Sequence, residues 1–183
     1  MNKINKIKQL FVKPEYIFVI PALFFGLIST VFIPQLSAND ENMHFIRSYE
    51  LTEGEIGHKC HLPVDIKERA FYQIYAKTPN FSFDKKKIDV SNKIATDCGT
   101  ATGYNPVLHI PQVLGVSLAK IIHPSTGAMI LFGRIANLLV YCAGLFVIIK
   151  YAQIGKWVLV IIGLMPTLLH MASSLSGDVV NNV

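Results

Sequence analysis

Charged residues are scarce in this sequence. Asp, Glu, Lys and Arg together make up 16% of its 183 residues, and 51% of the residues are hydrophobic. Soluble domains usually carry about a quarter charged residues. The mean hydropathy is +0.41, and the apolar residues gather in three blocks. This pattern excludes an ordinary soluble domain and predicts an integral membrane protein.

Cysteine is also scarce, which excludes a disulfide-rich scaffold. The chain has three cysteines, of which Cys142 lies in an apolar block and is interpreted as a small buried residue. Cys60 and Cys98 lie in the long polar segment, where spacing alone leaves open both a disulfide and two free thiols. The run His58-Lys59-Cys60-His61 does not predict zinc, because paired zinc ligands are usually separated by about two or more residues.

Positive charge does not gather in a patch with interleaved aromatic residues, so nucleic-acid binding is not predicted. The formal net charge is +5. Lys150 and Lys156 flank a short turn between the second and third apolar blocks, and four lysines precede the first block: Lys3, Lys6, Lys8 and Lys13. Because Lys and Arg concentrate in cytoplasmic loops, we expect a multi-pass plasma-membrane protein with its amino terminus inside and its long polar segment outside.

The three apolar blocks divide the chain into membrane spans and loops. The first block spans about 28 Å as a helix, close to the thickness of the bilayer core. It is longer than a typical signal-peptide core of about 7–15 residues, so a retained helix is favoured over a cleaved signal peptide, which stays the alternative. The predicted order is a cytoplasmic start (1–15), a span (16–34), an outer loop (35–124), a span (125–149), a cytoplasmic turn (150–156), a span (157–178) and a truncated end (179–183).

Helical spacing also occurs inside the predicted outer loop. A short helix is expected over residues 67–77. Residues 105–123 carry His109, Gln112 and Lys120, which make them too polar for a span, so we predict an interfacial helix on the outer membrane surface. The alternative is an amphipathic helix packed on the loop. The prediction rests on apolar residues that recur every three or four positions: Val107, Ile110, Leu114, Leu118 and Ile121.

The fold class is therefore predicted to be all-α and integral to the membrane, with about three transmembrane helices and a long extracytoplasmic loop that contains short helices. Ionisable residues of the three spans fall near the same outer end. Asp40 and Glu41 follow the first span, Arg134 lies roughly 12–14 Å along the second, and Asp178 ends the third. Such groups are costly near lipid and tend to face a cavity or a partner. The structural alternatives are helix capping by Asp40 and Asp178 and snorkelling by Arg134.

An ordered set of residues resembles a bacterial membrane-protein family known as domain of unknown function 2142 (DUF2142). The set begins in the segment after the first span, continues through a tyrosine-proline segment and an arginine-bearing second span, and ends in the third. Family members are longer and have many spans, so the chain resembles their amino-terminal part. The matching residues are Pro34, Asp40, Glu41, His44, Phe45, Arg47, Gly54, Tyr104, Pro106, Pro111, Gly133, Arg134, Asn137, Pro166, Ser173, Ser176 and Asp178.

The family is similar in layout to C-type glycosyltransferases, and this resemblance implies a function and a set of site residues. The implied activity is sugar transfer from a polyprenyl-phosphate donor in cell-envelope synthesis, and this fragment alone is expected to be inactive. The alternative is a non-catalytic membrane component or a transporter in polysaccharide assembly. Membrane lipid and the donor are the expected partners. No cofactor is predicted, and a divalent metal stays open. The implied catalytic residues are Asp40 and Glu41, and the implied substrate-binding residues are His44, Arg47, Tyr104, Arg134 and Asp178.

Overall fold

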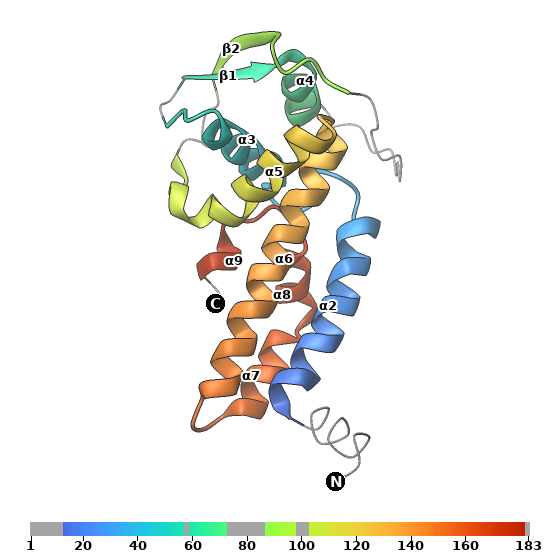
Figure 1. Cartoon of the computed structure of the whole chain (residues 1–183), viewed down its shortest axis with the longest axis vertical. Helices are drawn as coiled ribbons and strands as arrows, with labels where there is room; N and C mark the ends of the chain where they lie inside the picture. The colour runs from blue at the N-terminus through green and yellow to red at the C-terminus, as the bar shows by residue number, and fades with distance from the viewer. Residues whose placement is uncertain (1–12, 57–58, 73–86, 98–102, 182–183) are drawn as a thin grey trace.

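The computed structural model describes residues 13–56, 59–72, 87–97 and 103–181. They form an elongated molecule with a helical stem and a smaller head at one end (Figure 1). The stem consists of α2 (Pro14–Phe32), α6 (Thr126–Tyr151), α7 (Lys156–Gly163) and α8 (Pro166–Ala172). The head consists of α3 (Glu41–Thr52), β1 (Lys59–Pro63), α4 (Val64–Tyr72), β2 (Lys93–Asp97), the 3₁₀ helix η3 (Pro106–His109) and α5 (Ile110–Ile122), with the short α9 (Asp178–Asn181) beneath it.

Two stem helices are long and apolar enough to cross a membrane. They are α2, with 19 residues, and α6, with 26 residues. Large apolar side chains such as Phe24, Phe25 and Leu139 are exposed on them, as expected for helices in lipid. The structure therefore agrees with the first two predicted spans and with a mainly helical membrane protein.

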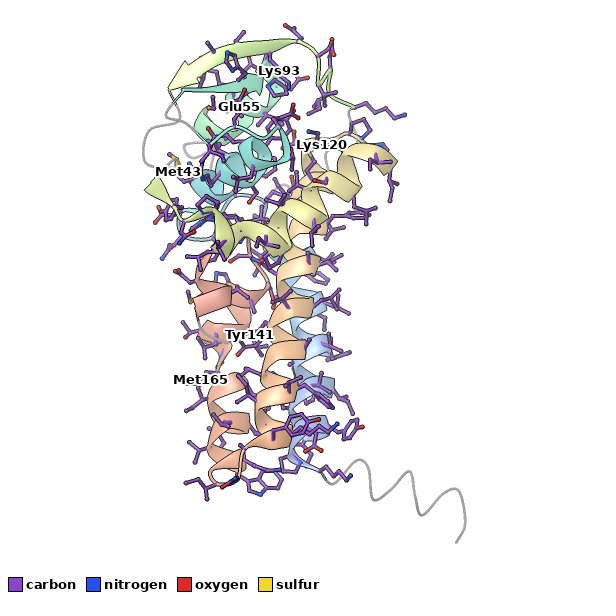
Figure 2. All side chains as sticks on the ribbon, turned by 60° about the vertical axis from the view of Figure 1, so that its left-hand side comes forward. Met43, Glu55, Lys93, Lys120, Tyr141 and Met165 are labelled. Atoms are coloured by element: carbon purple, nitrogen blue, oxygen red, sulfur yellow. The ribbon has the colours of Figure 1, made fainter. Side chains whose placement is uncertain are left out.

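The segment predicted as the third span is a broken helix. α7 ends at Gly163 and α8 begins at Pro166. Proline suits the first position of a helix, but it has no N–H to donate and its ring clashes with a preceding helical turn. The expectation of one continuous helix over residues 157–178 is thus wrong, whereas its crossing of the membrane stays a prediction. The Tyr141 hydroxyl donates to the Gly163 carbonyl at 2.8 Å, and Figure 2 shows Tyr141 and Met165 near this break.

The first helix is an integral part of the stem. Phe18 and Ala22 on α2 are fully buried in an apolar cluster with Leu138 and Tyr141 of α6. A Cβ atom at Gly26 would lie 2.4 Å from Leu138 Cδ1, so the two helices approach closely at this glycine. The retention of this helix in the mature protein stays a prediction.

The head contains a small antiparallel pair of strands above α3 and α5 and beside α4 (Figure 1). Strands β1 and β2 pair with Cys60 opposite Thr96. Cys60 is disulfide-bonded, Cys142 is a free buried thiol, and Cys98 lies outside the described residues. The helix predicted over residues 67–77 is present as α4 up to Tyr72, and its remainder lies outside the described residues.

The helix predicted over residues 105–123 is present as η3 followed by α5, and its place on the membrane surface stays a prediction. One side of α5 packs on α6, where a Cβ atom at Gly115 would lie only 2.4 Å from the backbone oxygen of Phe132. The close crossing therefore requires glycine at this position. The residues that predicted an apolar face are all exposed: Val107, Ile110, Leu114, Leu118 and Ile121.

Candidate functional site

A buried ion pair joins the head to the stem. Glu41, the first residue of α3, and Arg134, in the middle of α6, are 0% and 1% exposed. Arg134 Nε donates to Glu41 Oε1 and Arg134 Nη2 donates to Glu41 Oε2, both at 2.7 Å. This two-pronged geometry is the strongest form of an arginine–carboxylate contact.

The remaining N–H groups of Arg134 are also used within the chain. Nη1 donates to the carbonyls of Thr30 and Ile33, and Nη2 donates to that of Pro34, at 2.8–3.1 Å. These are carbonyls at the carboxyl end of α2 and just after it, where a helix leaves them without partners. Arg134 thus clamps the end of α2 to α6. The donor-phosphate role expected for Arg134 stays a prediction, and it would require at least one of these bonds to break.

Glu41 also holds the segment that follows α8. Its Oε1 atom accepts a hydrogen bond from the Leu175 backbone N–H at 3.0 Å. Asn137 on α6 reaches the same segment and donates to the carbonyls of Ser174 and Ser176 at 2.7 and 3.1 Å. Parts of the chain that are more than 90 residues apart are therefore fixed relative to one another at the junction of head and stem.

Asp40 differs from its neighbour Glu41. It is exposed, it lies at the N-cap of α3 with φ 54°, and its side chain makes no capping hydrogen bond. Aspartate tolerates this left-handed backbone conformation better than most residues. The backbone thus turns the buried carboxylate inward at Glu41 and leaves the Asp40 carboxylate at the surface.

Two histidines, the first of them four residues after Asp40, form a hydrogen-bonded chain. His44 Nδ1 and His109 Nε2 are 3.0 Å apart, and His109 Nδ1 lies 3.1 Å from the Asn105 carbonyl oxygen. A carbonyl can only accept, so Nδ1 of His109 carries the proton. Neutral His109 must then accept at Nε2, which makes Nδ1–H of His44 the donor.

Tyr104 covers this histidine pair, and Gly177 lies against it. The Tyr104 ring is tilted over the His44 ring with 4.4 Å between centroids. A Cβ atom at Gly177 would lie 3.2 Å from His109 Cε1, so a larger residue would push on the ring. Burial lowers the pKa of His109 to about 4 and also lowers that of His44, against the raising effect of Asp178, Asp40 and Glu41. Both rings are neutral at pH 7.

Asp178 approaches the same place from the other end of the chain. It is the exposed first residue of α9, and its Oδ2 atom accepts a hydrogen bond from the Ser176 hydroxyl at 3.2 Å. Burial raises the pKa of Tyr104, and the charges of Asp40 and Asp178 raise it further. Both carboxylates therefore act on the same histidine–tyrosine cluster.

Arg47 lies on the inner side of α3. It is 1% exposed and contacts Glu50 at 3.4 Å. Among the residues that the structure describes, the buried Arg47 Nε and Glu50 Oε1 atoms have no hydrogen-bond partner. Burial raises the pKa of Glu50, against the lowering effect of Arg47. The substrate-binding role expected for Arg47 stays a prediction, because this pair is enclosed by the head.

The structure brings four of the predicted site residues together, namely Asp40, His44, Tyr104 and Asp178, which we call the junction site. The other predicted residues form separate pairs, Glu41 with Arg134 and Arg47 with Glu50. His109 was missed, because at the start of an amphipathic helix it was interpreted only as a polar interruption. The available signal was its position four residues after Asn105, a spacing at which a side chain on a helical turn can reach the carbonyl of the earlier residue. Within the described ranges, no group of three or more His, Cys, Asp or Glu residues could hold a metal ion.

The helical stem, the apolar exposed surfaces and the polar junction site define an integral membrane protein with a polar head. Comparison with family models then gives the particular family. Residues 23–182 match the model described as a predicted membrane protein, DUF2142, and the chain belongs to this family. Comparisons with curated proteins and with solved structures give no match.

Proposed function

We propose that this protein is a membrane glycosyltransferase that uses a polyprenyl-phosphate-linked sugar as donor in cell-envelope synthesis. One observation carries the proposal. Exposed Asp40 and exposed Asp178, 138 positions apart in the sequence, both adjoin the cluster of His44, His109 and Tyr104. The His44 backbone N–H donates to the Asp40 carbonyl at 3.0 Å, and Gly177, the neighbour of Asp178, lies against the His109 ring. Perturbed ionisable groups that converge at one place are characteristic of functional sites.

The surroundings of the junction site suit a lipid-linked substrate. The site lies at the end of the stem, beside η3 and α5, whose apolar side chains Ile110, Leu114 and Leu118 are exposed. An amphipathic helix of this kind lies at the boundary between headgroups and acyl chains. A donor whose apolar chain remains in the bilayer would present its phosphate and sugar at this level.

The proposed orientation places the head outside the cell. The start of α2 and the turn between α6 and α7 lie at the opposite end of the stem (Figure 1). Lys13, Lys150 and Lys156 belong to these segments, and basic residues favour the cytoplasmic side. The disulfide at Cys60 is in the head, and disulfides persist in oxidising compartments rather than in the cytosol. Both observations support a junction site that opens to the outer leaflet.

In the proposed reaction, the acceptor hydroxyl attacks the anomeric carbon of the donor. A carboxylate next to the acceptor either takes its proton or orients it, and we assign this role to Asp40. Asp178 faces the same cluster and forms the other side of the site. Glu41 and Arg134 do not contact the substrate in this proposal. Their ion pair fixes the start of α3, which sets the position of Asp40.

Sugar transfer can be measured directly with Asp40→Asn in the full-length protein. This change keeps the shape of the side chain and removes its charge, so we expect transfer from polyprenyl-phosphate sugars to fall by at least about 100-fold. The melting temperature should stay within about 2 °C, because Asp40 is exposed. Asp89→Asn, a change at an exposed loop carboxylate that accepts hydrogen bonds from Ser91 in its own turn, is the matched control and should retain activity.

Two results would count against this function. Full activity of Asp40→Asn would remove Asp40 from the mechanism. An inactive wild type with every polyprenyl-phosphate sugar tested would favour the alternative, a non-catalytic component or transporter of envelope polysaccharide assembly. The saturated Arg134 is compatible with that alternative, because it performs a structural task.

A further inference from the structure

The hydrogen-bonded histidines determine which nitrogen of His44 is free. His109 receives the Nδ1 proton of His44 because its own Nδ1–H is committed to the Asn105 carbonyl. In neutral His44 the other nitrogen, Nε2, must then carry a lone pair. Within the described part of the chain, no hydrogen bond uses this Nε2 atom. The same logic orients the general base of hydrolytic triads, where a third group fixes the tautomer of a histidine.

We propose that His44 is the proton acceptor of the transfer reaction and that His109 is the positioning residue that fixes its tautomer. This inference rests on the proposed function and assigns separate tasks within it. His44 Nε2 takes the proton of the acceptor hydroxyl, and Asp40 orients the acceptor. The substrate group that His44 recognises is therefore a neutral hydroxyl.

The step balances without any further reactant. The acceptor O–H bond breaks and its proton moves to His44 Nε2, while a bond forms between the acceptor oxygen and the anomeric carbon of the sugar. The bond from this carbon to the phosphate oxygen breaks, and polyprenyl phosphate leaves with the electron pair. His44 becomes an imidazolium and returns its proton to water in the next step.

The charges around His44 suit a transient imidazolium. Asp178, Asp40 and Glu41 all favour its protonated form. Arg47, three residues after His44 on α3, acts against protonation of His109. Tyr104, which covers His44, is neutral at pH 7. The proton gained during the reaction is thus placed among carboxylates, while the ring is neutral before the reaction begins.

Variants at the two histidines separate the roles. His44→Gln can donate and accept hydrogen bonds but cannot take a proton, so we expect kcat to fall by at least about 100-fold with little change in the donor KM. His109→Leu removes the acceptor that fixes the tautomer and should lower kcat by at least about 10-fold. His109→Gln supplies an amide oxygen as acceptor and should recover most of that loss. His61→Gln, at an exposed histidine paired with Glu55, is the matched control.

The pH profile provides a readout that a merely structural role would not change. Catalysis requires neutral His44, so wild-type kcat/KM should fall as the pH drops through the pKa of His44, which burial holds below 6.5. In His44→Gln the residual activity should lose this acidic limb. An unchanged limb would show that another group takes the proton.

The outcomes distinguish this inference from the proposed function. If Asp40→Asn abolishes transfer but His44→Gln retains it, the glycosyltransferase assignment stands and the role of His44 is overturned. If wild type transfers no sugar, both fail. A third measurement tests the tautomer in the folded protein. ¹⁵N NMR of His44 should show a protonated Nδ1 and an unprotonated Nε2, and the reverse pattern would overturn the positioning role of His109.

Discussion

At the scale of single residues, the adjacent carboxylates Asp40 and Glu41 have different tasks. The sequence places them together, and either could serve as the base. The left-handed backbone at Asp40 directs Glu41 into the interior, where it pairs with Arg134, and leaves Asp40 exposed. Sequence patterns identified the right segment and the right depth for Arg134. They could not identify its partner, because a bond between residues 93 positions apart depends on tertiary packing.

The buried pair predicts a large stability difference between the two carboxylates. Glu41→Gln would leave the Arg134 charge without its counter-ion in a water-free site, so we expect a loss of about 3–5 kcal/mol of unfolding free energy. Asp40→Asn is the matched control at the neighbouring exposed position and should cost within about 0.5 kcal/mol. Thermal or denaturant unfolding in detergent measures both. Equal losses for the two variants would contradict the clamp.

At the scale of elements, predictions succeeded where apolar residues follow a single period. The five residues that predicted the helix over residues 105–123 are all exposed, Val107 on η3 and the other four on α5. The two long apolar helices α2 and α6 were found with nearly the observed bounds. α3 was not predicted. It buries polar residues together with apolar ones, such as Arg47 and Ser48 beside Phe45 and Tyr49. The sequence of α3 therefore shows no periodic apolar face from which a helix could be predicted. The break before Pro166 was missed because proline is common in membrane helices.

The crossing of α5 over α6 predicts that Gly115 cannot be replaced. A Cβ atom there would meet the Phe132 oxygen and carbonyl carbon at 2.4 and 2.6 Å, and backbone atoms cannot move aside as a flexible side chain can. Gly115→Ala should therefore separate the two helices and cost about 1–3 kcal/mol. Gly103→Ala is the control, because a Cβ atom at Gly103 meets nothing within 4 Å.

Two measurements report the effect of Gly115→Ala, namely the melting temperature of the protein and the environment of a probe on α5. The melting temperature should fall for Gly115→Ala and stay unchanged for Gly103→Ala. A probe on α5, for example at Leu114, should also report a changed environment only in the first variant. Equal stability of both variants would show that α5 does not depend on this close approach.

At the scale of the whole molecule, the ion pair of Glu41 and Arg134 fixes the position of the head relative to the stem. α2, α6 and the segment around Leu175 meet at Glu41 and Arg134, and Glu41 lies three residues before His44 on α3. The stem carries the apolar surface that suits lipid, and buried polar residues lie both in the head, such as Arg47, and in the stem, such as Arg134 and Asn137 (Figures 1 and 2). The distribution of lysine predicts the orientation of this arrangement in the membrane, and the shared depth of Asp40 and Asp178 predicts that they lie near one another. The hydrogen bond between His109 and His44 became visible only in three dimensions.

The central claim is that the junction site opens at the outer face of the membrane, and cysteine labelling tests it most directly. A single exposed cysteine is introduced as Asp40→Cys or as Gln153→Cys, at the opposite end of the stem. A membrane-impermeant maleimide should label Asp40→Cys in intact cells and Gln153→Cys only after permeabilisation. Protein without either change controls for Cys142, which is buried. Labelling of Gln153→Cys in intact cells, with Asp40→Cys protected until permeabilisation, would contradict the orientation and the function built on it.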